Sequence, residues 1–168
     1  MKTRPGFLIF LLLSAYTLQS QEMNRKIIDE RTGSEILVGY CNREGLMQGD
    51  FGKDYDLEYN DYIPDRKVVK KISKRSRGVS IAIILGTWCP DSREQVPRFY
   101  KILDEAGIGE EILTVICVDG YKQFDDTTGG LYDIEKVPTF IFIRDGMEIG
   151  RIVESPEESL EKDFLSFL

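Results

Sequence analysis

The chain has 168 residues, 42% of them hydrophobic, which is enough for one globular domain with an ordinary core. It carries 22 basic and 29 acidic side chains, and the resulting net charge of −7 argues against nucleic acid as a partner, because an acidic surface repels phosphates. It contains no histidine, which excludes Ser–His–Asp and Cys–His catalysis and histidine-ligated metals. We therefore predict no metal and no other cofactor.

The first residues have the pattern of a secretory signal. Lys2 and Arg4 precede an apolar core at Phe7–Leu13, and a polar exit ends at the small residue Ser20. The apolar core is short for a membrane span. We therefore expect residues 1–20 to be a signal peptide and the protein to be exported, either periplasmic or secreted. An uncleaved N-terminal anchor is the alternative.

An N-terminal extension, residues 21–60, is expected before the main domain at 61–168. Residues 22–31 are polar and charged and predict a linker or a frayed helix. The β-branched, apolar run at 35–41 predicts a strand. Residues 42–52 hold three glycines in a polar run, which predicts a loop.

Three tyrosines in an acidic segment share one face of a possible helix. Tyr55, Tyr59 and Tyr62 have the i, i+4, i+7 spacing of such a face. Their expected use is packing rather than ligand binding. A second helix is predicted from 65 to 75, where Pro64-Asp65 provides the start.

Two continuous apolar runs, 80–87 and 112–118, predict buried strands, and a helix with one apolar face lies between them at 92–106. Residues 139–144 and 147–153 predict a hairpin that turns at Asp145-Gly146.

A last helix is predicted from Ser155, which would cap it, with Pro156 at the first helical position and Glu158 completing a capping box. This order of elements predicts parallel βαβ units followed by an antiparallel pair, in an α/β protein with a mixed central sheet and helices on both faces.

The stretch Trp88-Cys89-Pro90-Asp91-Ser92 falls between the predicted strand and helix at the centre of the chain. Cys89 would lie at the helix N-terminus, where unpaired backbone N–H groups and the macrodipole favour the thiolate form. Pro90 fits the first helical position because its missing N–H has no partner there. Cys89 is therefore a candidate nucleophile; an inert cysteine on a binding scaffold is the alternative.

This stretch resembles the Trp-Cys-x-x-Cys active-site loop of the thioredoxin-like family, with Ser92 in the place of the second cysteine. Val137-Pro138-Thr139 resembles the cis-proline loop of that family. Pro97 lies where the long helix of the family is commonly kinked. The resemblance covers residues 65–168 and implies a thioredoxin-like fold.

The resemblance also implies an activity, which is thiol–disulfide exchange on protein or peptide disulfides with Cys89 as the nucleophile. Ser92 cannot resolve a mixed disulfide but can donate a hydrogen bond to the Cys89 sulfur, so an external thiol would act as reductant in a monothiol oxidoreductase or isomerase. A non-catalytic peptide-binding or folding-assistance module is the alternative. The residues implied in substrate binding are Trp88, Pro90, Val137, Pro138 and Thr139.

Two positions depart from the family pattern. Ile83 stands where many relatives carry a buried acid, and Val115 stands where many have a lysine, so two groups that assist dithiol reduction are missing. Cys41 and Cys117 each end a predicted strand, and each is either a small buried hydrophobe or a resolving or structural thiol. A bridge between these two would leave Cys89 as the free thiol.

Overall fold

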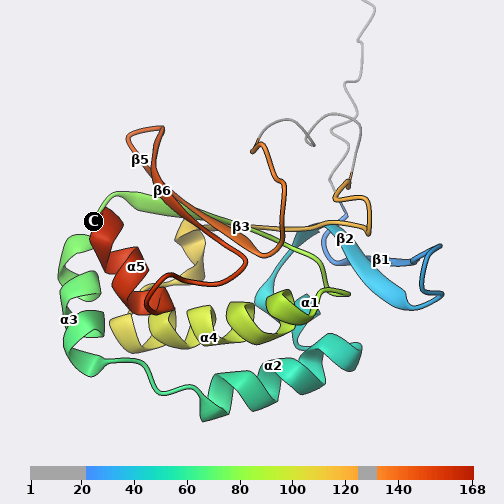
Figure 1. Ribbon diagram of the computed structural model, residues 1–168, viewed down its shortest axis with the longest axis horizontal. Helices are drawn as coiled ribbons and strands as arrows, with labels where there is room; N and C mark the ends of the chain where they lie inside the picture. Colours follow the sequence, from blue (N-terminus) through green and yellow to red (C-terminus); the bar gives the residue numbers. More distant parts are fainter. Residues whose placement is uncertain (1–21, 125–131) are drawn as a thin grey trace, which may run out of the picture.

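The computed structural model describes residues 22–124 and 132–168, which form a six-stranded mixed sheet packed against helices (Figure 1). The strand order is β1-β2-β4-β3-β5-β6. The predicted signal peptide at 1–20, with the alternative anchor, lies outside the described residues. The elements in chain order are β1 (Arg25–Ile28), β2 (Glu35–Cys41), α1 (Arg43–Leu46), α2 (Gly49–Asp61), α3 (Arg66–Arg75), β3 (Val79–Leu85), α4 (Pro90–Ala106), a 3₁₀ turn (Glu110–Ile112), β4 (Leu113–Cys117), β5 (Thr139–Arg144), β6 (Met147–Val153) and α5 (Leu160–Phe167).

The middle of the sheet is built from the apolar strands that the sequence predicts. β3 and β4 run parallel, with Ile83 opposite Val115. β5 lies antiparallel on the other side of β3, with Phe140 opposite Ile83, and β6 completes the hairpin. The mixed sheet confirms the α/β class.

The edge of the sheet formed by the N-terminal strands differs from the expectation. β2 pairs antiparallel with β4, with Gly39 opposite Cys117, so β2 and β3 do not form a parallel βαβ unit. Residues 22–31, predicted as a linker or frayed helix, contain β1, which pairs antiparallel with β2. A tight turn in which Gly33 adopts the left-handed conformation folds β1 back onto β2, and this turn brings a polar segment into the sheet.

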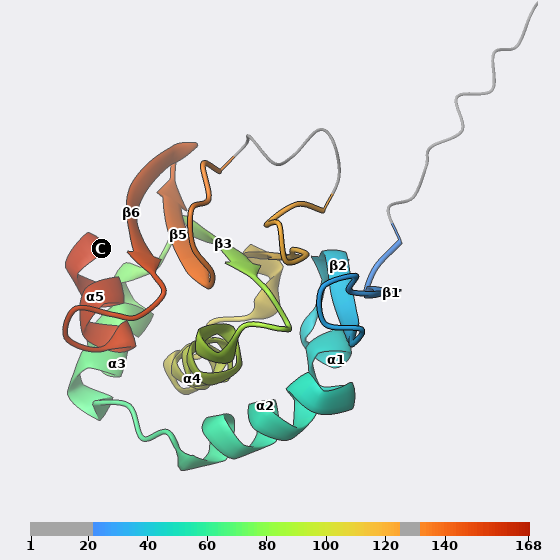
Figure 2. The same cartoon turned by 45° about the vertical axis from the view of Figure 1, so that its right-hand side comes forward.

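Alternate side chains of the central strands enter two separate cores. Ile83 and Leu85 join the cluster that receives buried side chains from all five helices, whereas Ala82 and Ile84 enter a second cluster on the other face. Figures 1 and 2 show the helices on one side of the sheet. For the described residues, the prediction that helices cover both faces of the sheet is therefore wrong. The described parts of the 118–138 connection, which cover the second face, are loop.

The predicted loop at 42–52 contains α1 and the start of α2. Asn42 caps α1, because its side-chain oxygen accepts the Gly45 N–H at 3.0 Å. Asn24, the residue before β1, supports this cap, since its amide donates to the Asn42 oxygen at 2.7 Å and its own oxygen accepts the Asn42 N–H at 3.0 Å. The cap depends on Asn24, which is 18 positions away in the sequence. The three glycines that led to the loop prediction carry no information about such a distant partner.

The last helix begins after Ser159 rather than at Ser155. The Ser159 hydroxyl accepts the Lys162 N–H at 3.3 Å and caps α5. The Asp163 carboxylate accepts the N–H groups of Glu157 and Glu158, so these residues stay outside the helix. The predicted capping box is therefore wrong by one turn.

The tyrosine face of α2 packs against α4, as the spacing predicts. Tyr55 is 2% exposed, and its ring stacks on that of Tyr59 with centroids 6.0 Å apart. Tyr55 also contacts Tyr100 of α4, with ring centroids 5.8 Å apart. This stripe packs into and against the core, as expected.

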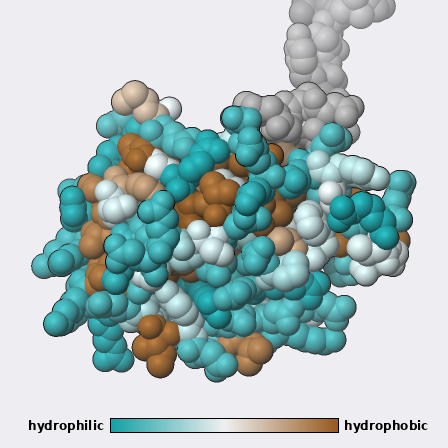
Figure 3. Space-filling model, viewed as in Figure 1, coloured by the Kyte–Doolittle hydropathy of each residue, from teal (hydrophilic) through white to brown (hydrophobic). Residues whose placement is uncertain are grey.

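The surface is mainly hydrophilic in the view of Figure 3, where apolar side chains show as separate patches. Among residues 22–124 and 132–168, no helix combines the length and the apolar character needed to cross a bilayer.

Glu161 joins α5 to the segment between α2 and α3. Its carboxylate accepts the Tyr62 hydroxyl at 2.7 Å and the Asp65 N–H at 3.0 Å, and the residue is 4% exposed. Burial opposes ionisation of this carboxyl, but the hydrogen bonds outweigh it and lower the pKa of Glu161 below its usual value.

We predict that Glu161→Gln lowers the free energy of unfolding by about 1–3 kcal/mol at pH 7, because an amide keeps one acceptor oxygen for two donors. The folded pKa lies below the unfolded value of about 4.3, so this contribution is complete above that pH and is lost as the pH falls through the folded pKa. Urea unfolding from pH 7 to pH 3 measures it, with the exposed Glu157→Gln as control. Equal stability of Glu161→Gln and the wild type at pH 7 contradicts the prediction.

Candidate active site

The loop that links β3 to α4 carries Cys89. β3 ends at Leu85, Cys89 is the N-cap residue of α4, and Pro90 is the first helical residue. The Cys89 carbonyl accepts the Arg93 N–H at 3.1 Å, which is the first hydrogen bond of the helix. The predicted place of Cys89, between a buried strand and a helix N-terminus, is confirmed.

The thiol of Cys89 meets the loop that precedes β5. Its Sγ donates to the Val137 carbonyl oxygen at 3.2 Å, and the Val137–Pro138 peptide bond is cis. Cys89 and Val137 both belong to the second core cluster, which also contains Ile116 and Val118. Cys89 is 6% exposed, so the corner between the two loops encloses most of the residue.

Hydrogen bonds fix the conformation of the loop before β5. Thr139 is 1% exposed, and its hydroxyl donates to the Lys136 carbonyl at 2.7 Å. The Pro138 carbonyl accepts the Glu154 N–H at 2.8 Å, and Pro138 itself is buried. Thr139, predicted to bind substrate, therefore shapes the loop from inside, and the Val137 backbone is the part that meets Cys89.

Ser92 lies one helical turn after Cys89 and is fully buried. Its hydroxyl oxygen accepts the Gly86 N–H at 3.3 Å. Among the described residues, no hydrogen bond joins Ser92 to the Cys89 sulfur. The expected donation from Ser92 is not observed, because the hydroxyl is turned toward the end of β3 and the thiol toward Val137.

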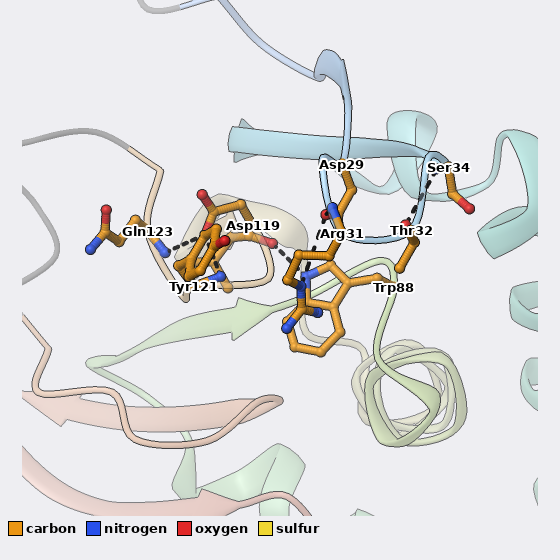
Figure 4. A network of polar contacts seen from close by, with 9 residues as sticks. Asp29, Arg31, Thr32, Ser34, Trp88, Asp119, Tyr121 and Gln123 are labelled. Carbon is orange, nitrogen blue, oxygen red and sulfur yellow. Dashed lines mark hydrogen bonds and ion pairs between the residues drawn. The ribbon is translucent and has the colours of Figure 1, made fainter.

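Trp88 lies at the rim of the site, half-buried beside the exposed Pro90. Its indole N–H donates to the Val118 carbonyl at 3.0 Å. Figure 4 shows the Trp88 side chain next to that of Arg31. A Cβ at Gly86 would lie 2.6 Å from the indole ring, so the missing side chain of Gly86 makes room for it. Trp88 and Pro90 thus form an apolar rim next to Cys89.

A family model described as Thioredoxin matches residues 54–162. The chain belongs to the thioredoxin family. This match includes the Cys89 loop, α4 and the Val137–Pro138 corner, and it begins after β1 and β2.

This thioredoxin-family chain resembles known proteins at low sequence identity. It is 29% identical over 92 residues to the TPR repeat-containing thioredoxin TDX of Arabidopsis thaliana, covering 55% of this chain and 23% of that protein. It is 24% identical over 94 residues to Thioredoxin H9 of the same plant, covering 56% and 63%. The chain thus spans less than two thirds of either protein.

Two further comparisons extend over more of the chain. Thioredoxin H-type 1 of Nicotiana tabacum is 27% identical over 112 residues, covering 67% of this chain and 79% of that protein. A solved structure of a Pseudomonas aeruginosa protein of unknown function has a TM-score of 0.49 and 13% identity, covering 70% of this chain and 80% of that one.

The N-terminal strands of this thioredoxin-family chain contact the active-site loop. The Thr87 hydroxyl accepts the Leu37 N–H of β2 at 3.1 Å. Arg93 donates to the Thr87 carbonyl at 2.9 Å and to the Asp54 carboxylate of α2 at 2.8 Å. The sequence did not predict these hydrogen bonds, because Leu37 is 50 residues from Thr87. A buried threonine directly after an apolar strand was the one available signal.

The other two cysteines lie on the opposite face of the sheet from Cys89. Cys41 and Cys117 are buried in the cluster on the helix side, whereas Cys89 belongs to the loop-side cluster. Cys41 is opposite Val115 and Gly39 is opposite Cys117, so the two cysteines are diagonal neighbours on adjacent strands.

These positions bear on the roles of Cys41 and Cys117 that the sequence left open. Burial raises the pKa of the Cys117 thiol, and all three cysteines are free thiols in the structure. The sheet separates Cys117 from Cys89, so a resolving role for Cys117 lacks the contact it requires. A structural bridge between Cys41 and Cys117 stays a prediction. Within the described residues, no three Cys, Asp or Glu side chains are grouped to hold a metal ion.

Trp88 is the only tryptophan in the chain, so its fluorescence reports on the rim. We predict that Gly86→Ala displaces the indole, breaks its hydrogen bond to Val118 and shifts the emission to longer wavelength. Gly150→Ala is a matched control, because a Cβ there would lie 2.2 Å from the Phe167 ring, away from Trp88. An emission maximum that is unchanged in Gly86→Ala contradicts the described packing.

Proposed function

We propose that this chain is an exported monothiol thiol–disulfide oxidoreductase or isomerase that acts on protein disulfides through Cys89. The observation that carries the proposal is the position of the Cys89 sulfur. Cys89 lies at the N-terminus of α4, and its sulfur is 3.2 Å from the Val137 carbonyl oxygen. Membership of the thioredoxin family supports thiol–disulfide exchange as the chemistry.

The first step forms one bond and breaks another. The Cys89 thiolate attacks one sulfur of a substrate disulfide, an S–S bond forms between Cys89 and that sulfur, and the second substrate sulfur leaves as a thiolate. In isomerisation, a substrate thiolate then attacks the mixed disulfide, forms a new substrate disulfide and releases the Cys89 thiolate. This cycle has no net oxidation and needs no reductant.

Net reduction requires a thiol from outside the chain. An external thiolate attacks the mixed disulfide and bonds to one sulfur, and a second external thiol completes the transfer of two electrons. The Ser92 hydroxyl cannot replace this nucleophile. Cys117, which is fully buried on the other face of the sheet, has no contact with Cys89.

The edge of the Val137–Pro138 corner supports binding of an extended peptide. A backbone segment of a substrate laid against Val137 would pair with it as an added strand does. Trp88 and Pro90 supply apolar surface beside the sulfur. The substrate would therefore be a polypeptide rather than a small disulfide alone.

A non-catalytic peptide-binding module is the second candidate, and the burial of Cys89 favours it. Only 6% of the residue is exposed. The buried positions Ile83 and Val115 also lack the acid and the lysine that many relatives have. This module would use the same rim and corner, with no turnover.

Trapping with a model peptide disulfide separates the two functions. We predict that the wild type forms a mixed disulfide visible by mass spectrometry, that Cys89→Ala does not, and that the control Cys41→Ala does. A wild type that binds the peptide without forming the adduct contradicts the enzyme and supports the module.

Replacing Ser92 by cysteine tests the monothiol mechanism. We predict that Ser92→Cys greatly shortens the lifetime of the mixed disulfide, because a second thiol one turn after Cys89 can release the substrate. Ser92→Ala is the matched control and should leave the adduct long-lived. Equal adduct lifetimes in Ser92→Cys and the wild type contradict the idea that the missing thiol determines the mechanism.

Export is a separate part of the proposal, and the signal pattern in residues 1–20 supports it. Sequencing the N-terminus of the protein recovered from extracytoplasmic fractions tests it. A mature chain that begins near residue 21 is expected, and a protein found only in the cytoplasm contradicts it.

A further inference from the structure

The turn between β1 and β2 projects Arg31 toward the active site. The Asp29 carboxylate accepts the Arg31 N–H at 2.8 Å, and the Asp29 backbone bonds to both Gly33 and Ser34. Figure 4 shows this turn beside Trp88 and the segment that contains Asp119 and Tyr121. The turn is thus a closed unit that holds one arginine at the rim of the Cys89 site.

The guanidinium of Arg31 packs against two aromatic rings and a glycine. Its central carbon lies 5.2 Å from the centre of the Trp88 ring and 6.0 Å from that of Tyr121, which are cation–π distances. A Cβ at Gly120 would lie 2.2 Å from Nε of Arg31, so the absence of a side chain at Gly120 admits the group. Arg31 therefore stands on the same tryptophan that borders Cys89.

The terminal N–H groups of the guanidinium have no hydrogen-bond acceptor among the described residues. Nε lies 4.0 Å from the Asp29 carboxylate, and Nη1 and Nη2 donate no hydrogen bond to any residue of the described ranges. The side chain is 43% exposed. Two terminal N–H groups in a fixed plane match a carboxylate in bidentate geometry.

We propose that Arg31 is a specificity residue that binds an aspartate or glutamate carboxylate of the substrate, next to the disulfide that Cys89 attacks. This inference rests on the proposed function. A polypeptide lying over Trp88 on its way to Cys89 passes the guanidinium, and its anionic groups are carboxylates. The charge acts locally, because the chain as a whole is acidic with a net charge of −7.

The test uses three peptide disulfides that differ only in one residue beside the cysteine, which is Glu, Gln or Lys. We expect the wild type to form its mixed disulfide with the Glu peptide about five-fold faster than with the Gln peptide, and more slowly still with the Lys peptide. Added salt at about 0.5 M should shrink this preference, because the pair is exposed.

Three variants separate recognition from a structural role. Arg31→Gln should react equally with all three peptides, and Gly120→Ala, which displaces the guanidinium without removing it, should lose most of the preference. Arg66→Gln removes an exposed charge on α3 and should keep the wild-type preference. A uniform loss of rate on all peptides in Arg31→Gln would mean a structural role and would overturn the proposal.

Failure of this inference is distinguishable from failure of the proposed function. If the wild type reacts with the Glu and Gln peptides at equal rates, the enzyme stands and the role of Arg31 is wrong. If no peptide reacts, the enzyme is wrong, and binding to Cys89→Ala followed through Trp88 fluorescence still tests Arg31. Tighter binding of the Glu peptide, lost in Cys89→Ala/Arg31→Gln, is then expected, and equal affinities contradict it.

Discussion

The contact between the Cys89 thiol and the Val137 carbonyl joins two loops that are 48 residues apart in the sequence. One loop ends a buried parallel strand and begins α4, and the other begins β5 on the far side of that same strand. Because β3 is fixed on both sides by β4 and β5, neither loop can move far without disturbing the centre of the sheet. The sheet thereby holds a sulfur at a helix N-terminus and against the backbone of the Val137–Pro138 corner, which is the arrangement that the proposed chemistry needs.

The N-terminal strands make this site different from one built by the matched region alone. The Leu37 N–H bonds to Thr87, α2 holds Arg93 through Asp54, and the β1–β2 turn places Arg31 on Trp88. Each contact comes from residues that precede or begin the region matched by the family model, and each ends on the loop around Cys89 or on the first turn of α4. The N-terminal segment therefore contributes to the candidate active site in two ways: it holds the loop, and it places a charge at the rim.

The parts of the fold that could be predicted from the sequence are those fixed by local pattern. The strands around Ile83 and Phe140 follow from apolar runs, and α4 follows from its apolar face and Pro90. The pairing of β2, the Asn42 cap and the later start of α5 depend on partners that are distant in sequence or that compete for the same N–H groups, so local signals could not give them. In the site, the motif located Cys89 and the Val137 corner. It did not reveal that Ser92 turns toward Gly86, or that Arg31 reaches Trp88.

The proposed function requires that the Cys89 sulfur, although mostly enclosed, reacts with other thiols and disulfides in the folded protein. The direct measurement is mass mapping of the three cysteines after brief alkylation of the native protein, followed by unfolding and a second, distinguishable alkylation. The account predicts that Cys89 carries the first label and that Cys41 and Cys117 do not, either because they carry the second label or because they are bridged. A native protein in which Cys89 remains unlabelled until it is unfolded would contradict the account.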